Sequence, residues 1–499
     1  MNNNYYPDRS KFKRLAKKGN LIPVYRELLA DFETPVTAFC KIDNSSYSFL
    51  FESVEGQVKV GRYSFLGSDP EVIIKSKNNE MTIIRKGKKQ ERKIVDNPFD
   101  ELKKIMSEYK FVKIKGIPRF CGGLVGYLGY DMVRFIEDIP ETTRDSLNLA
   151  DSYLMLAETI LIFDNVTKTL KVISNAYIKD KDIDSAYKRA IRRIEEKIRL
   201  LKRGNIQRKT LVEKRRNQKR RFKSNFTKEQ FKKIISKAKR YIKEGEIIQV
   251  VLSQRLKTKI KTEPFDIYRT LRYVNPSPYM FYLKYDDLRL IGSSPEIMVR
   301  LEDNKVEVRP IAGTRPRGKD EKEDERLIKE LLNDPKEKAE HIMLVDLGRN
   351  DIGRICQYGS VYVPQLMKIE KYSHVMHLVS DCLGKIKKGK DMFDCIKSTF
   401  PAGTVTGAPK VRAMEIIDEL EKDKRGPYAG SVIYFSYSGN LDSCITIRTI
   451  IVKGDTAYIQ AGAGIVADSH PEKEYQETLN KAKGMLRAIE LAENLKSWY

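Results

Sequence analysis

Residues 401–420 read PAGTVTGAPKVRAMEIIDEL, a run of small residues followed by a helical pattern. The first part holds glycines, threonines and alanines, and apolar residues then recur at helical spacing from Val411 to Leu420. Backbone N–H groups at a helix N-terminus, together with the helix dipole and threonine hydroxyls, can receive a carboxylate or a phosphate. The stretch therefore predicts either an anion site or an ordinary loop and helix start.

Length and composition predict a soluble globular protein with two domains. The chain has 499 residues, long for one hydrophobic core, and 41% of them are hydrophobic and 32% charged. Six cysteines are scattered without a Cys-x-x-Cys pair, which indicates free thiols in a reducing compartment. No apolar run has the length of a membrane span or a signal-peptide core, so we expect a cytoplasmic protein without membrane contact.

The formal net charge of +26 raises the question of a nucleic-acid partner. Part of the excess is local, because residues 202–223 hold eleven Lys or Arg and one acid, Glu213. Elsewhere the lysines stand mostly beside glutamates, and no zinc-finger spacing or aromatic RNA-binding motif is present. We therefore expect a charged, solvated surface, and we do not expect nucleic-acid binding as the main role on this composition.

Short apolar runs separated by turn residues predict strands over much of the chain, including 36–42, 47–53 and 62–67. Helices are expected at 97–110, from the capping box of Thr227 and Gln230 to Gly245, and at 265–273, 335–347 and 470–495. Because strands group together instead of alternating with helices, the fold class is α+β with large, mainly antiparallel sheets. The expected division is 16–180, a charged helix and basic linker at 181–225, and 226–499.

Two of the expected helices carry paired carboxylates. Asp334 can cap the first, where Glu337 and Glu340 lie three residues apart on one face. On the second, Glu474 and Glu477 have the same spacing, after a capping box of Ser469 and Glu472. Either pair can be a solvated helix face. If the two pairs face each other, they supply the oxygen ligands that suit Mg²⁺.

Two further features near the C-terminus allow more than one interpretation. QAGAGIVA at 460–467 matches a dinucleotide fingerprint but lies outside any βαβ unit, so a dinucleotide site is discounted, while its backbone N–H groups can still bind an oxyanion. Arg448 stands on a strand of small and apolar residues. It is either paired structurally or forms a fork for a substrate carboxylate.

Long segments of the second half resemble the chorismate-utilising enzymes, in particular the large subunits of anthranilate synthases. The matching segments are PIAGTRPRG (310–318), AEHIMLVDLGRNDIGR (339–354), YSHVMHLVSD (372–381), FPAGTVTGAPKVRAMEIID (400–418), RGPYAGSVIYFS (425–436), DSCITIRT (442–449) and QAGAGIVADSHPEKEYQETLNKAKGML (460–486). The first half resembles the family's regulatory domain more weakly, through FLFESVEG and the glycines at 122–130.

The resemblance implies a sandwich of antiparallel sheets with helices packed outside. It also implies a Mg²⁺-dependent conversion of chorismate and ammonia to anthranilate and pyruvate, through an aminated intermediate that still carries the pyruvyl group. The residues that it assigns to the metal are Glu337, Glu340, Glu474 and Glu477. Those that it assigns to the ring carboxylate are Thr404, Gly462, Ala463 and Gly464, and those for the pyruvyl carboxylate are Tyr428 and Arg448.

The resemblance also assigns proton transfer to two residues. Glu296 is implied as the general acid for the leaving hydroxyl, although it can be a strand-end carboxylate on the surface. His377 is implied as the base for pyruvate elimination, although it can be a core histidine.

Two positions distinguish this chain from related activities. Aminodeoxychorismate synthases typically have a nucleophilic lysine where Ala312 stands. Isochorismate and salicylate synthases typically have a lysine at the position of Gln249, and an amide cannot activate water as a base. Both differences favour ammonia as nucleophile and anthranilate as product.

The family's end-product control implies an L-tryptophan site that couples the two halves. The implied residues are Ser53, Asn275, Pro276, Tyr279 and Met280, which can equally form a plain domain interface. No glutaminase unit is present in the sequence, so ammonia from glutamine requires a separate amidotransferase subunit. The alternatives are an aminodeoxychorismate synthase component I and a non-catalytic regulatory or nucleic-acid-binding relative.

Overall fold

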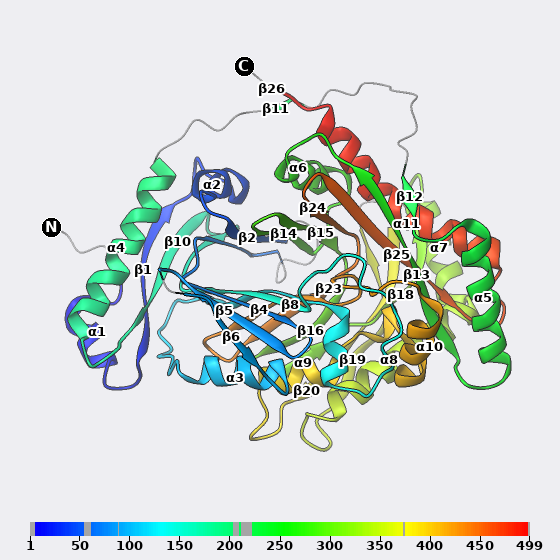
Figure 1. Ribbon diagram of the computed structural model, residues 1–499, viewed down its shortest axis with the longest axis horizontal. Coiled ribbons are helices and arrows are strands. Elements are labelled where there is room, and N and C mark those ends of the chain that lie inside the picture. Colours follow the sequence, from blue (N-terminus) through cyan, green and yellow to red (C-terminus); the bar gives the residue numbers. More distant parts are fainter. Residues whose placement is uncertain are drawn as a thin grey trace.

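The computed structural model describes residues 5–53, 61–87, 89–202, 209–210, 222–372 and 375–497. Most of the basic stretch expected within 181–225 thus lies outside the described residues. Figure 1 shows two large sheets in the middle of the molecule, with the helices arranged around them. Over these residues no helix is long and apolar enough to cross a membrane.

The first sheet runs through both halves of the chain. Its strands, in spatial order, are β1 (Leu21–Leu29), β10 (Thr169–Tyr177), β9 (Thr159–Asp164), β3 (Tyr63–Ser68), β2 (Tyr47–Glu52), β14 (Tyr279–Tyr285), β15 (Leu288–Ser294), β24 (Thr449–Lys453), β25 (Thr456–Ile465), β13 (Gln249–Lys259) and β12 (Lys223–Ser224), with β21 (Gly407–Ala408) also on β13. All pairs are antiparallel, and β2 joins the halves by pairing Phe51 with Phe281 of β14.

The second sheet is built in the same way. Its order is β18 (Ile311–Pro316), β20 (Val375–Lys385), β17 (Lys305–Val308), β16 (Ile297–Glu302), β23 (Leu441–Ile445), β22 (Ser431–Ser436), β7 (Gly123–Leu128), β8 (Ser152–Ala157), β4 (Val72–Lys77), β5 (Glu80–Arg85) and β6 (Glu91–Ile94), with β19 (Tyr362–Lys371) also on β20. Here β7 and β22 join the halves. The halves therefore share both sheets, and the division into a regulatory and a catalytic part stays a prediction about roles.

The helices cover the outer faces of the two sheets. They are α1 (Arg9–Leu15), α2 (Pro35–Ile42), α3 (Pro98–Ser107), α4 (Ile183–Lys202), α5 (Lys228–Lys243), α6 (Pro264–Val274), α7 (Glu321–Asn333), α8 (Pro335–Gly353), α9 (Met392–Thr399), α10 (Lys410–Leu420) and α11 (Pro471–Glu493), with 3₁₀ turns η1 (Tyr130–Phe135) and η2 (Gly403–Val405). A short pair, β11 (Lys209–Thr210) and β26 (Lys496–Ser497), completes the described elements. Aromatic and aliphatic residues from both sheets fill the space between them, as in a β-sandwich. The expected α+β sandwich is confirmed.

Two local predictions were wrong. Residues 36–42 form helix α2 instead of a strand, because Thr34 and Thr37 make a reciprocal capping box and Pro35 occupies the first turn. Helix α11 begins after His470 without a side-chain cap. The Ser469 hydroxyl accepts a hydrogen bond from the Val466 N–H instead, and Glu472 pairs with Lys228 on α5.

Candidate active site

A cavity of about 570 Å³ gathers the residues predicted for chemistry. Of the residues predicted for catalysis, substrate binding and metal binding, all except Ala463 line it. Its wall combines helices α8 and α11 with strands β13, β18, β20 and β25 and the loop that contains η2. Segments more than 200 residues apart in sequence therefore meet in one space.

The two glutamate pairs converge on this cavity from different helices. Asp334 caps α8 by accepting hydrogen bonds from the N–H groups of Lys336 and Glu337, which fixes the first turn that carries the pair. The charges of Glu337 and Glu477 both act on Glu340, so the carboxylates of α8 and α11 lie close enough to interact. The solvated-face interpretation is therefore excluded for Glu340.

Nearby basic and amide groups neutralise these carboxylates. Arg315 on β18 pairs with Glu337 at 3.1 Å, and Lys481 pairs with Glu477 at 2.6 Å. Gln249 Nε2 lies 3.4 Å from Glu340 Oε1. Burial, followed by the charge of Glu337, raises the pKa of Glu340, and burial also raises the pKa of Glu474.

The donor set fits Mg²⁺, which binds through few carboxylates and keeps water molecules for an anionic ligand. Four glutamates of two helices face one cavity, and burial, with a smaller contribution from the neighbouring glutamates, raises the pKa of Glu340 and of Glu474. In the described part of the chain no group of three such side chains is already drawn together around an ion position.

Arg448 supplies the opposite charge in the same cavity. It follows β23 with φ of +50°, in the left-handed region that few non-glycine residues adopt. Its guanidinium forms no ion pair or hydrogen bond with any other described residue, and burial lowers its pKa. A half-buried cation that forms no ion pair with a described carboxylate is a ready partner for a carboxylate ligand.

Tyr428 and the glycines of β25 form the adjoining wall. A side chain at Gly462 would come within 2.8 Å of the Tyr428 hydroxyl, so glycine is needed there. Burial raises the pKa of Tyr428 to about 12, which keeps its hydroxyl a donor. The side chain of Ala463 packs in the core, because alternate residues of a strand face opposite sides, so its predicted role depends on its backbone alone.

Glu296 lies between β15 and β16 and is 8% exposed. Burial raises its pKa to about 8, while the nearby Thr404 hydroxyl and Lys481 act in the opposite direction. The carboxyl is thus protonated near neutral pH and can give a proton to a leaving group. The surface-carboxylate interpretation of Glu296 is excluded.

His377 lies on β20 with one ring nitrogen already engaged. Its Nδ1 lies 3.2 Å from the Gly313 carbonyl and 3.0 Å from the Thr314 hydroxyl. A carbonyl can only accept, so Nδ1 carries the proton and Nε2 keeps its lone pair. Burial lowers the pKa of His377, which favours this neutral form.

A second, smaller cavity of about 60 Å³ lies between the two sheets and contains part of the predicted effector set. Ser53, Tyr279 and Met280 line it, whereas Asn275 and Pro276 do not. Asn275 ends α6, and its amide donates to the Ser293 hydroxyl at 3.1 Å. Three of the five residues predicted for the effector thus line one cavity, and that this cavity binds an effector stays a prediction.

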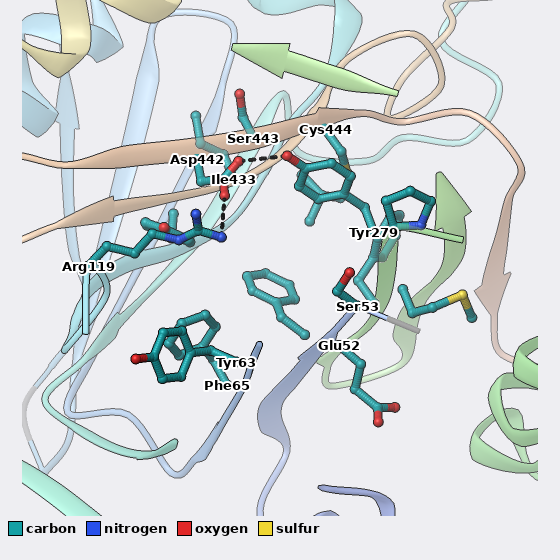
Figure 2. A pocket seen from close by; sticks show the side chains of 16 residues that line it. Glu52, Ser53, Tyr63, Phe65, Arg119, Tyr279, Ile433, Asp442, Ser443 and Cys444 are labelled. Atoms are coloured by element: carbon teal, nitrogen blue, oxygen red, sulfur yellow. Dashed lines mark hydrogen bonds and ion pairs between the residues drawn. The ribbon is translucent and has the colours of Figure 1, made fainter. Parts of the chain in front are cut away.

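Several residues around this second cavity were not predicted. Figure 2 shows Asp442 joined both to the Tyr279 hydroxyl, at 2.9 Å, and to the Arg119 guanidinium, at 3.3 Å. The Ser53 hydroxyl, Arg119 Nε and the Tyr434 hydroxyl are buried without a partner among the described residues. Such groups can receive a polar ligand. No local signal in the sequence connects Arg119 with Asp442, because sheet pairing brings them together.

Two residues missed around the main cavity did carry a signal. Lys481 follows Glu477 by four residues, so it lies on the same helix face, and it also donates to the Gly462 carbonyl at 2.9 Å. Gln460 precedes Gly462 by two residues on β25, so it shares the cavity side of the strand.

Comparison with known proteins shows similarity to chorismate binding enzymes over almost the whole chain. The sequence profile of the chorismate binding enzymes matches residues 46–487. The chain is 49% identical over 495 residues to anthranilate synthase component 1 of Acetivibrio thermocellus, covering 99% of this chain and 100% of that protein.

Solved structures agree with the fold. The crystal structure of anthranilate synthase component I from Streptococcus pneumoniae TIGR4 superposes with a TM-score of 0.75 at 35% identity, over 92% of this chain and 98% of the other. The menaquinone-specific isochorismate synthase of Escherichia coli superposes with a TM-score of 0.69 at 19% identity, over 96% and 98%, which concerns the fold alone.

Proposed function

The chain belongs to the chorismate binding enzyme family, and from that premise we propose that it converts chorismate and ammonia to anthranilate and pyruvate. The proposal rests on one observation: the same cavity contains the half-buried Arg448, whose guanidinium has no ion pair among the described residues, and four glutamates on α8 and α11. Chorismate has two carboxylates, one on the ring and one on the enolpyruvyl arm. The arrangement provides a separate receptor for each.

Substrate binding follows from this division of charge. Arg448 and the Tyr428 hydroxyl would hold the pyruvyl carboxylate by charge-assisted hydrogen bonds. Thr404 and the backbone of 462–464 would hold the ring carboxylate, with Glu337, Glu340, Glu474 and Glu477 as ligands of Mg²⁺ beyond it. Mg²⁺, when bound, would neutralise that carboxylate and act as a Lewis acid.

The reaction has two chemical steps, and each depends on proton transfer. In the first, ammonia forms a C–N bond to the ring, the C–O bond to the ring hydroxyl breaks, and the Glu296 carboxyl gives its proton so that water leaves. The spare ammonium proton returns to Glu296. In the second, His377 Nε2 takes the ring proton, the C–O bond between the ring and the enolpyruvyl oxygen breaks, and the ring becomes aromatic. The released enolpyruvate takes one proton at its methylene carbon and becomes pyruvate.

We propose that ammonia comes from glutamine through a separate amidotransferase subunit, and that the protein acts in a reducing cytoplasm. The six cysteines, all free thiols, support the second point. The direct test incubates the chain with chorismate, Mg²⁺ and ammonium at pH 7.5 and follows anthranilate fluorescence. Activity with ammonium but not with glutamine alone supports the whole proposal, and no anthranilate from a folded protein contradicts it.

Ala312 should separate this activity from that of an aminodeoxychorismate synthase. It lines the main cavity, so Ala312→Lys would introduce an amine nucleophile that competes with ammonia at the ring. We expect anthranilate formation to fall about tenfold or more, with a lysine adduct or an aminodeoxychorismate product visible by chromatography and mass spectrometry. Ala312→Met is the control of similar length, and equal product ratios for the two variants would contradict the argument.

We propose that L-tryptophan inhibits the enzyme from the second cavity. Aromatic walls, the Arg119 guanidinium and the Asp442 carboxylate are suited to an indole, a carboxylate and an ammonium group. Because Ser53 faces this cavity, Ser53→Phe should fill it and raise the inhibitory tryptophan concentration about tenfold or more, with an unchanged KM for chorismate. Ser107→Phe, at the exposed end of α3, is the control. Unchanged inhibition in Ser53→Phe would remove the effector from this cavity.

A further inference from the structure

An ion pair without solvent contact lies just behind the wall of the main cavity. Glu421, which ends α10, and Arg425 have side chains that are each 2% exposed. Arg425 Nε donates to Glu421 Oε2 at 3.0 Å and its Nη2 donates to Oε1 at 2.6 Å, a two-pronged contact. Neither side chain lines the cavity.

The same guanidinium binds two backbone carbonyls of cavity-lining residues. Its Nη1 donates to the Val405 carbonyl at 2.7 Å, and its Nη2 donates to the Val251 carbonyl at 2.7 Å. Val405 directly follows Thr404, and Val251 lies two residues after Gln249. Arg425 thereby connects the loop at 403–405 to strand β13.

Glu421 extends the connection to a third element. Its Oε1 accepts hydrogen bonds from the Ser253 N–H at 2.8 Å and from the Ser253 hydroxyl at 2.9 Å. The Ser253 hydroxyl in turn accepts from Gln460 Nε2 at 2.8 Å, and Gln460 lines the cavity. The guanidinium also lies 5.6 Å from the ring centre of Tyr428.

Stability alone does not explain a pair buried this completely. Removing two charges from water costs about as much as their attraction returns, and apolar residues of similar volume often serve a fold as well or better. A network in which every partner is fixed by another does, however, hold its members in one arrangement. Here the members are segments that carry Thr404, Gln249, Gln460 and Tyr428.

We propose that Arg425 is a positioning residue for substrate binding, whose guanidinium holds the Thr404 loop, strand β13 and Tyr428 in the arrangement that receives the two carboxylates of chorismate. This inference rests on the proposed function. It assigns Arg425 no contact with substrate. Glu296 and His377 lie on other segments, between β15 and β16 and on β20, and neither is hydrogen-bonded to Arg425 or Glu421. Because Glu296 meets the network only through the Thr404 hydroxyl, we expect substrate binding to depend on the network more than proton transfer does.

The test is Arg425→Lys, which keeps the positive charge beside Glu421 but has one nitrogen in place of the fork that reaches two carbonyls. We expect the KM for chorismate to rise about tenfold or more while kcat changes less than about threefold. A purely structural role would lower the midpoint of thermal unfolding, Tm, and leave the KM of the folded enzyme unchanged. That result would overturn the proposal.

Two further variants make the result specific. Arg134→Lys changes another arginine, half-buried, which pairs with Asp418 of α10 at 2.7 Å and forms no hydrogen bond or ion pair with a residue that lines the cavity. Its KM should equal that of the wild type. Ser253→Ala keeps the ion pair but breaks the connection to Gln460, and should raise KM about threefold. Ser253→Ala tests the proposal even if Arg425→Lys fails to fold, because an unchanged KM in Ser253→Ala would contradict the positioning role of the network. An inactive wild type would instead refute the proposed function.

Discussion

Replacing Glu340 by glutamine should lower kcat about a thousandfold and abolish the binding of Mg²⁺ in the millimolar range. Glu340 interacts electrostatically with Glu337 on its own helix and with Glu477 on α11, so it links the two glutamate pairs. An amide keeps the size of the side chain but offers a neutral oxygen, which a hard divalent cation binds poorly. Activity and a direct titration with Mn²⁺, followed by electron paramagnetic resonance, measure the two effects separately.

Glu472→Gln is the matched control, since Glu472 lies on the first turn of α11 but forms a surface pair with Lys228 at 2.6 Å. It should keep wild-type activity and wild-type metal binding. Glu340→Gln with full activity and an unaltered Mn²⁺ titration would show that the convergence of the two helices has no role in metal binding. Loss of activity with intact metal binding would instead assign Glu340 to substrate.

The helices that carry the glutamates were predictable because their signals are local. Asp334 before Pro335 marks the start of α8, and residues three apart on a helix necessarily share a face. The same kind of signal exists before α2, where Thr34 and Thr37 form a capping box and Pro35 occupies the first turn. The β-branched and aromatic residues at 36–42 outweighed it, so that helix was predicted as a strand.

The meeting of the two glutamate pairs could not be predicted in this way. It depends on the pairing of β13 with β25 and of β18 with β20, contacts between segments far apart in the chain. The residues missed around the second cavity have the same origin, because Arg119 meets Asp442 only through the shared second sheet. Arg425 was missed for another reason. Its importance lies in hydrogen bonds to backbone carbonyls, which leave no trace in residue type.

Replacing Glu296 by glutamine should lower the rate of anthranilate formation about a hundredfold or more, because glutamine cannot protonate the leaving hydroxyl. The environment of Glu296 makes a second, independent expectation possible. Its pKa is raised to about 8, so the protonated form dominates below that pH and is lost as the pH rises through it. In the wild type, kcat/KM should therefore fall above about pH 8, on the alkaline side, as one carboxyl loses its proton.

The pH dependence of protein stability reports the same Glu296 proton without substrate. Between the ordinary pKa of a glutamate and about 8, the folded state holds a proton that the unfolded state has released, so the free energy of unfolding declines as the pH rises across this window. Glu296→Gln has no such proton and avoids burying a charge, so its Tm should exceed that of the wild type by more at pH 9 than at pH 6. Asp303, an exposed carboxylate after β16, gives the control. Asp303→Asn should match the wild type in Tm at pH 6 and at pH 9 and in the rate of anthranilate formation. If the alkaline loss of activity persists in the residual activity of Glu296→Gln, and the wild-type stability curve shows no decline across this window, the titration belongs to another group and Glu296 loses its role as the acid.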